Sequence, residues 1–164
     1  MKILKVTTKS QIQVVARLAK EIWNEHYIPI IGSKQVDYMV ENFQSSNAIN
    51  RQIKDGYEYY LVQNNGKNAG YFAFLCDTEQ SHMFLSKLYV HKNFRSLGIA
   101  RTCIIFMEDI CKKSKLKKIW LTVNKYNQIA IAAYRKMGFS NVESIAQDIG
   151  NGFIMDDYKM EKKI

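Results

Sequence analysis

Residues 82–123 carry the pattern that most limits how this chain can fold. Residues 82–90 alternate as a strand does, an amphipathic helix follows to about Lys113, and residues 118–123 read KIWLTV. A strand that is apolar on both faces lies inside a sheet, and a strand–helix–strand crossover joins parallel strands. The stretch therefore predicts a parallel pair of strands inside a sheet.

The rest of the chain adds antiparallel strands and further helices. Asn65-Gly66 is a strong type I′ hairpin signal between two segments of period two. Strands are also predicted at 2–6, 57–63, 68–76, 139–147 and 153–161, with helices before residue 56 and after Asn127. We expect an α/β (α+β) fold, with a mixed, mostly antiparallel central sheet of about six to seven strands flanked by helices. No linker or composition shift divides the chain, so one domain is expected over residues 1–164.

Local signals predict the ends of the first helix. Ser10 and Gln13 have the spacing of a capping box, and Pro29 and Gly32 interrupt the helical spacing of the apolar residues. We therefore expect this helix to start at Ser10 and to stop between Pro29 and Gly32.

The composition is that of a globular chain. The 164 residues are 47% hydrophobic and 24% charged, which excludes a disordered or collagen-like protein. No apolar run approaches the roughly 20 residues of a membrane helix, and no signal peptide is recognisable. Cys76, Cys103 and Cys111 form no C-x-x-C and no metal-ligand spacing. We expect buried free thiols, a cytoplasmic location, no membrane association and no bound metal.

A loop with one glycine joins the predicted strand at 82–90 to the helix that follows. Residues 95–100 read RSLGIA, and Lys92 and Arg101 add positive charge on either side. The N–H groups and dipole of a helix start attract anions, and glycine allows close approach to the backbone. The loop therefore suits a pyrophosphate, although an ordinary strand–helix turn has the same features. It matches neither G-x-x-x-x-G-K-[ST] nor G-x-G-x-x-G, so neither a P-loop nor a dinucleotide site is indicated.

The net charge of +9 is compatible with either nucleic acid or a small phosphorylated ligand. The densest basic stretch, residues 112–118, lies at the end of its helix away from the RSLGIA loop and contains no aromatic residue. We interpret it as cations at a helix C-terminus followed by a solvated loop, so nucleic acid is the less favoured partner.

The RSLGIA loop resembles a family motif. It fits the R/Q-x-x-G-x-G/A motif of the GCN5-related N-acetyltransferase (GNAT) family, and residues 88–90 look like the strand that precedes this motif. Residues 123–139 are similar to the family's VN…N…A…Y.K.GF segment, and the element order matches over essentially the whole chain. A weaker similarity to PaiA-type spermidine/spermine acetyltransferases covers residues 18–54, 57–63, 68–71, 119–121 and 129–130, whereas the tail at 148–157 departs from that type.

The resemblance implies acetyl-CoA as the cofactor, acting as acetyl donor, and a primary amine as the acceptor. The backbone of the RSLGIA loop would bind the CoA pyrophosphate, and Leu88 and Val90 would hold the pantetheine arm and help to polarise the thioester. Asn127 would contact the same arm, and Tyr134 would protonate the departing thiolate as general acid. The implied cofactor-binding residues are Leu88, Tyr89, Val90, Arg95, Ser96, Leu97, Gly98, Ile99, Ala100, Asn127 and Tyr134.

From the residues alone, Asn127 fits an N-cap as well as it fits a contact with the cofactor. Tyr134 has the alternative role of a core tyrosine. Direct attack on the thioester also requires a base or a chain of water molecules, because an amine with a pKa near 10 is mostly protonated at neutral pH. Glu58 is the base candidate that we name first. The other candidates are Glu25, Asp37, Asp77 and Asp156. The acidic residues of the tail, which would attract a cationic amine or merely solvate a hairpin, are Asp148, Asp156 and Asp157.

The favoured function is acetyl transfer to a small-molecule amine such as a polyamine, by direct attack through a tetrahedral intermediate. Two other functions stay open: a CoA-binding regulatory module without turnover, and a basic nucleic-acid-binding protein. The resemblance makes a homodimer plausible, but no interface can be identified from the sequence.

Overall fold

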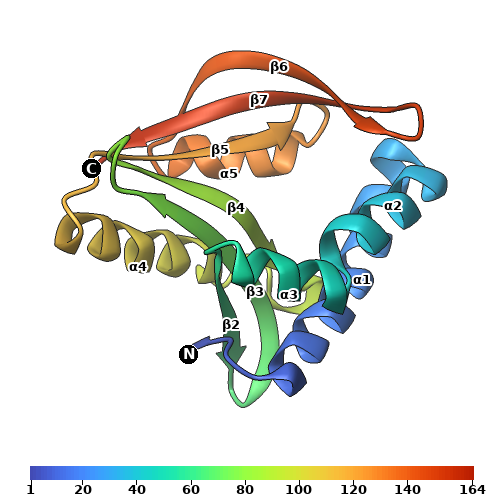
Figure 1. Cartoon of the computed structure of the whole chain (residues 1–164), viewed down its shortest axis with the longest axis horizontal. Helices are drawn as coiled ribbons and strands as arrows, with labels where there is room; N and C mark the ends of the chain where they lie inside the picture. Colours follow the sequence, from blue (N-terminus) through green and yellow to red (C-terminus); the bar gives the residue numbers. More distant parts are fainter. The chain divides into compact units, whose positions relative to one another are not determined.

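The computed structural model describes all 164 residues and contains seven strands and five α-helices (Figure 1). The elements in chain order are β1 (Lys2–Lys5), α1 (Lys9–Ile31), α2 (Ser33–Met39), a π-helical segment (Val40–Gln44), α3 (Ser46–Lys54), β2 (Glu58–Asn64), β3 (Lys67–Asp77), β4 (His82–Val90), a 3-10 turn (Lys92–Phe94), α4 (Ile99–Lys113), β5 (Lys118–Asn124), α5 (Gln128–Lys136), β6 (Ser140–Gly150) and β7 (Phe153–Lys163). The strands pair in the order β1-β2-β3-β4-β5-β7-β6, and β4 and β5 are parallel. The predicted α/β fold with a mixed sheet and a parallel crossover pair is confirmed.

The chain divides into two compact units that alternate along the sequence. Unit 1 comprises residues 1–75 and 87–100, and unit 2 comprises residues 76–86 and 101–164. Strands β3 and β4 and helix α4 each contribute residues to both units. That the two units act together as one domain stays a prediction.

Unit 1 is built on the antiparallel strands β1, β2 and β3. The β2–β3 hairpin turns at Asn65 and Gly66, whose φ angles of 49° and 75° are those of the predicted type I′ turn. Helix α1 packs an apolar stripe against one face of these strands. The buried core of this face includes Ile12, Val15, Leu18, Ile22, Tyr59, Leu61 and Tyr71.

The predicted start of α1 is wrong, and of the two residues predicted to interrupt the helix only Gly32 ends it. Thr8, not Ser10, is the N-cap: its hydroxyl accepts from the Gln11 N–H at 3.3 Å, and the Gln11 side chain accepts from the Thr8 N–H at 3.0 Å. The same capping-box spacing recurs two residues earlier than predicted. At the other end α1 continues through Pro29, which lacks only one helical hydrogen bond near the terminus, and it stops at Gly32, where φ is +82°.

Unit 2 is built on β5, β7 and β6, and β7 pairs antiparallel with both β5 and β6. The first residues of β4 also belong to this unit and run parallel to β5. Figure 1 shows β6 and β7 as a long hairpin and α5 behind β5. Its buried core includes Met83, Met107, Ile119, Leu121 and Met160. Cys103 and Cys111 are buried as predicted, and burial raises the pKa of each thiol to about 12, whereas Cys76 is half-buried. Both buried cysteines therefore act as packing residues.

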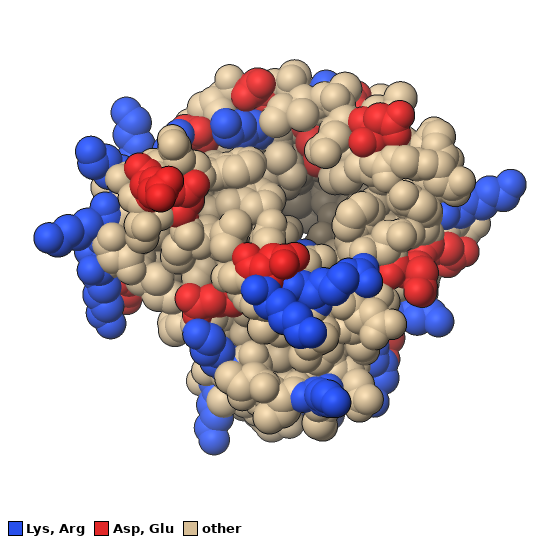
Figure 2. Space-filling model, viewed as in Figure 1, with Lys and Arg blue, Asp and Glu red and all other residues tan.

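The charged side chains are dispersed on the face that Figure 2 shows. Lys and Arg project singly or in small groups, and Asp and Glu lie among them. Lys112 and Lys113 occupy the last turn of α4, and Lys118 pairs with Glu161 at 2.9 Å. This arrangement agrees with the interpretation of residues 112–118 as helix-terminal and solvated cations. None of the helices is both long and apolar enough to span a membrane.

Candidate functional site

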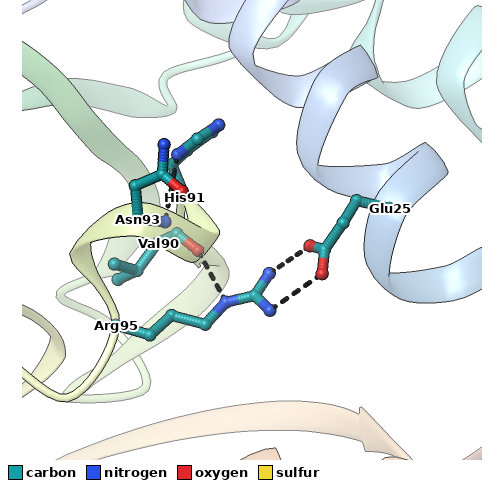
Figure 3. Close-up of polar contacts among 5 residues, drawn as sticks. All are labelled: Glu25, Val90, His91, Asn93 and Arg95. Atoms are coloured by element: carbon teal, nitrogen blue, oxygen red, sulfur yellow. Dashed lines mark hydrogen bonds and ion pairs between the residues drawn. The ribbon is translucent and has the colours of Figure 1, made fainter.

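The loop after β4 begins with a short, internally hydrogen-bonded turn. The Phe94 N–H donates to the His91 carbonyl at 2.8 Å, and the Asn93 N–H donates to His91 Nδ1 at 3.3 Å (Figure 3). The His91 N–H donates to the Ala69 carbonyl at 2.8 Å, which ties the start of the loop to β3. The loop therefore leaves the sheet in a defined direction.

The second half of the loop has a left-handed backbone at two positions. The φ angles of Ser96 and Gly98 are +63° and +75°. Left-handed residues that alternate with ordinary ones are typical of backbone concavities that bind anions. A Cβ placed on Gly98 would meet no protein atom within 4 Å, so the space beside this glycine is open to a ligand. Helix α4 begins at the next residue, Ile99, so the loop has the features that suit a pyrophosphate.

The end of β4 lies unusually close to β3. A Cβ placed on Gly70 would lie 2.4 Å from the Tyr89 carbonyl oxygen, which is closer than real Cβ contacts come. Only glycine fits there without displacing one of the two backbones. The Tyr89 ring packs against Trp23 and Tyr71, with centroid distances of 5.7 and 5.3 Å. Packing and close backbone approach thus fix the stretch that contains Leu88 and Val90.

Arg95 is held by α1 and by the end of β4. Its Nη1 and Nη2 donate to the two carboxylate oxygens of Glu25 at 3.2 and 2.6 Å, and its Nε donates to the Val90 carbonyl at 3.2 Å (Figure 3). Sequence reasoning assigned Arg95 only to the pyrophosphate and Glu25 to the candidate bases. The guanidinium lowers the pKa of Glu25, chiefly through the hydrogen bond. Glu25 is therefore the counter-ion of Arg95, and the pair connects α1 to the loop.

Lys87 is a buried cation in unit 1 that sequence reasoning missed. Its Nζ donates to Gln52 Oε1 at 2.7 Å, and the Tyr59 hydroxyl donates to the same oxygen at 2.6 Å. Nζ also lies 5.5 Å from the centroid of the Tyr59 ring. Burial lowers the pKa of Lys87 to about 8. The signal was the period of two in β4, which places Lys87 on the same buried side as Met83 and Leu85.

Asn127 and Tyr134 belong to unit 2. Asn127 is buried and caps α5, because its Oδ1 accepts from the Ala130 N–H at 3.2 Å. The predicted N-cap is therefore confirmed. Tyr134 is half-buried on α5, and its ring meets Phe139 edge-on at 5.5 Å. The contacts of both residues with the cofactor stay predictions.

The predicted base candidates are engaged in ordinary polar contacts or exposed. Glu58 accepts from Lys5 Nζ at 2.6 Å and from the Tyr60 hydroxyl at 2.8 Å. Asp156 pairs with Lys125, Asp77 accepts from the Gln80 N–H at 2.8 Å, and Asp37 is exposed. One carboxylate differs from all of these: Asp157 on β7 is only 4% exposed, and its Oδ1 has no hydrogen-bond partner.

The comparison with protein families agrees with this geometry. The model of the "Acetyltransferase (GNAT) family" matches residues 17–139, which include the loop and α5 up to Phe139. The chain belongs to the GNAT family. It is an acetyl-CoA-dependent N-acetyltransferase, as its sequence predicted. Its residues contain no group of three or more His, Cys, Asp or Glu side chains arranged to hold a metal ion.

Solved GNAT structures share the fold over nearly the whole chain. The PaiA N-acetyltransferase from Thermoplasma acidophilum, in complex with coenzyme A, is 19% identical with full coverage of both chains and a TM-score of 0.79. A variant of the spermidine N-acetyltransferase SpeG from Vibrio cholerae is 18% identical over 99% of this chain and 95% of its own, with a TM-score of 0.69. The ribosomal-protein-alanine N-acetyltransferase from Escherichia coli is 18% identical over 99% and 93% of the two chains, with a TM-score of 0.74. At these identities the likeness shows a common fold.

Proposed function

We propose that the chain transfers the acetyl group of acetyl-CoA to the primary amine of a small cationic molecule such as a polyamine. The observation that carries the proposal is the loop of residues 95–98, in which Ser96 and Gly98 are left-handed and Gly98 borders open space directly before α4. Similarity to the spermidine acetyltransferase SpeG and to the PaiA type supports a polyamine as the acceptor. A peptide amine is the second candidate, because the ribosomal-protein-alanine acetyltransferase has the same fold.

The roles that we propose for the loop rest on backbone groups. N–H groups of residues 96–100 bind the pyrophosphate, assisted by the dipole of α4, whereas the Arg95 N–H donates to the Lys92 carbonyl at 3.3 Å. Leu88 and Val90 hold the pantetheine arm by backbone hydrogen bonds, in the way an added strand would. The Arg95–Glu25 pair keeps the loop in shape, so Arg95 contributes less free charge to the phosphates than the sequence suggested.

We propose two further roles in unit 2. The side-chain amide of Asn127 contacts the cofactor arm while its oxygen caps α5. Tyr134 protonates the CoA thiolate as the tetrahedral intermediate collapses.

The first experiment measures CoA and acetylated product by mass spectrometry, with acetyl-CoA and a panel of amines. The panel contains spermidine, spermine, aminoglycosides, free amino acids and peptide N-termini. We expect turnover of the polyamines, and we expect Gly98→Asp to abolish acetyl-CoA binding because its side chain fills the open space and repels phosphate. Turnover of peptides alone would mean that the acceptor is a peptide amine and not a polyamine. Saturable acetyl-CoA binding without any turnover would favour a regulatory module.

Tyr134→Phe tests the general acid. We expect kcat to fall about 10- to 10⁴-fold with little change in acetyl-CoA affinity, because only the proton donor is lost. Tyr126→Phe is the matched control, since Tyr126 is 70% exposed on the loop before α5. Equal activity of the two variants would return Tyr134 to a packing role.

A further inference from the structure

Asp157 is a buried carboxylate with an unfilled hydrogen-bonding position. It lies on β7 opposite Asn124 of β5, and it receives a hydrogen bond from the Thr122 side chain. Its Oδ1 atom is buried and has no hydrogen-bond partner. Such an orphaned acceptor is costly, and its presence indicates a donor that arrives with a ligand or a water molecule.

Contacts within unit 2 show which face of β7 carries this carboxylate. Lys162 Nζ donates to the Met137 carbonyl at the end of α5 and pairs with Glu108 of α4. The even-numbered residues of β7 therefore face α4 and α5. Asp157 has the opposite parity, like Lys159, whose Nζ lies 5.1 Å from the Trp120 ring centroid. Asp157 thus lies across the sheet from α5, the helix that carries Tyr134.

This placement suits the two proton transfers of acetyl transfer. The amine loses a proton on one side of the thioester, and the sulfur gains one on the other. Asp157 pairs with Asn124, the last residue of β5, and the loop that carries Asn127 starts there. The Asn127 N–H donates to the Asn124 carbonyl at 2.9 Å, and the Lys125 N–H donates to the Asp156 carbonyl at 3.0 Å. Asp157 is therefore at the same end of β5 as the proposed cofactor contact.

The lysines of the segments next to Asp157 pair with other carboxylates. Lys125, after β5, is paired with Asp156, and Lys159 lies 3.9 Å from Glu143 of β6 and 3.7 Å from Glu161. Burial raises the pKa of Asp157 to about 6, with Asp156 adding to the rise and Thr122 and Lys125 opposing it. The group is thus charged at neutral pH and still able to accept a proton.

We propose, on the basis of the function proposed above, that Asp157 receives the acceptor's ammonium group and takes its proton during attack on the thioester. The N–H bond breaks as the proton moves to the carboxylate, directly or through one water, and the nitrogen lone pair forms the N–C bond. The C–S bond then breaks, and the thiolate takes a proton from Tyr134. The amide nitrogen releases its second proton to solvent, Tyr134 regains a proton from solvent, and Asp157 returns its own proton to solvent.

Asp157→Asn tests this assignment, with Asp156→Asn as the matched control. Asp156 is the adjacent carboxylate, has the same size and is 40% exposed in its pair with Lys125. The rate is measured from pH 5 to pH 9.5 with spermidine, or with the panel amine that the wild type acetylates. Thermal unfolding and acetyl-CoA affinity establish that each variant is folded.

We expect the wild-type kcat/KM to rise through an ionisation near pH 6 and then to stay level. The kcat/KM of Asp157→Asn should be about 100-fold below the wild-type value at pH 7 and should rise roughly tenfold per pH unit, because only the small fraction of free amine then reacts. Asp156→Asn should keep the wild-type rate at pH 7 and the shape of the profile, with the ionisation moved below pH 6, because Asp156 adds to the rise of the Asp157 pKa. A packing role for Asp157 would change the rate but not the shape of this profile.

Two outcomes overturn the assignment while leaving acetyl transfer intact. One is an Asp157→Asn variant with the wild-type rate and profile. The other, which holds even if the variant does not fold, is a wild-type profile without an ionisation near pH 6. If the wild type acetylates no amine of the panel, the proposed function itself fails and the assignment fails with it.

Discussion

Glu25 in unit 1 and Asp157 in unit 2 are both carboxylates near elements proposed for catalysis, and their surroundings are opposite. Glu25 has a side chain that is 35% exposed and two hydrogen bonds from Arg95, which lower its pKa. Asp157 is 4% exposed, lacks a cation of its own and has a raised pKa. The comparison shows that the surroundings, and not the type of residue, set the pKa of each carboxylate.

The largest expected effect is on the stability of Asp157→Asn. A pKa that folding raises from 3.8 to about 6 means that the folded state binds more protons between these values. Stability therefore falls as pH rises through this window, by about 3 kcal/mol in total. We expect the variant to be more stable than the wild type at pH 8 by an amount of that order, measured by urea unfolding.

The pH dependence provides the control for this prediction. The wild type should lose stability between about pH 4 and pH 6 relative to Asp157→Asn, and the two should converge at the acidic end. A variant that is less stable than the wild type at pH 8 would mean that the Asp157 carboxylate has hydrogen-bond partners in solution. A more stable and less active variant is the pattern expected of a group kept for function.

The next effect concerns Arg95→Met. The substitution removes the bidentate pair with Glu25 and the hydrogen bond to the Val90 carbonyl. We expect the KM for acetyl-CoA to rise about tenfold, equivalent to about 1.4 kcal/mol, with kcat little changed. Arg101→Met, which removes an exposed cation just after the loop, is the control. Equal effects of the two substitutions would indicate that Arg95 acts through its charge alone.

The smallest effect is expected for Glu25→Gln. A half-exposed ion pair contributes about 0.5 kcal/mol, so both stability and acetyl-CoA affinity should change little and the change should shrink at high salt. Because the pKa of Glu25 is lowered, its stabilisation is lost as pH falls. This pH dependence of stability has the opposite sign to that of Asp157. Glu21→Gln, one turn earlier on α1, is the control. Tighter binding of acetyl-CoA by Glu25→Gln would instead mean that Glu25 competes with the phosphates for Arg95.

Local signals predicted much of the fold. The period-two segments, the Asn65-Gly66 turn and the Asn127 cap are confirmed, because each depends on residues close together in the chain. The predicted start of α1 was wrong because Thr8 and Gln11 have the same spacing as Ser10 and Gln13. Spacing alone does not distinguish two capping boxes offset by two residues.

The sequence by itself determined the family, the acetyl donor and the positions of the loop and α5, because these depend on short motifs. Only the tertiary structure decided which carboxylate is paired and which is buried. Glu25 and Arg95 are 70 residues apart, and their pairing depends on α1 lying beside the loop. The burial of Asp157 depends on the pairing of β5, β7 and β6. A carboxylate's pKa is set by desolvation and by charges within a few ångströms, and the fold brings those neighbours together.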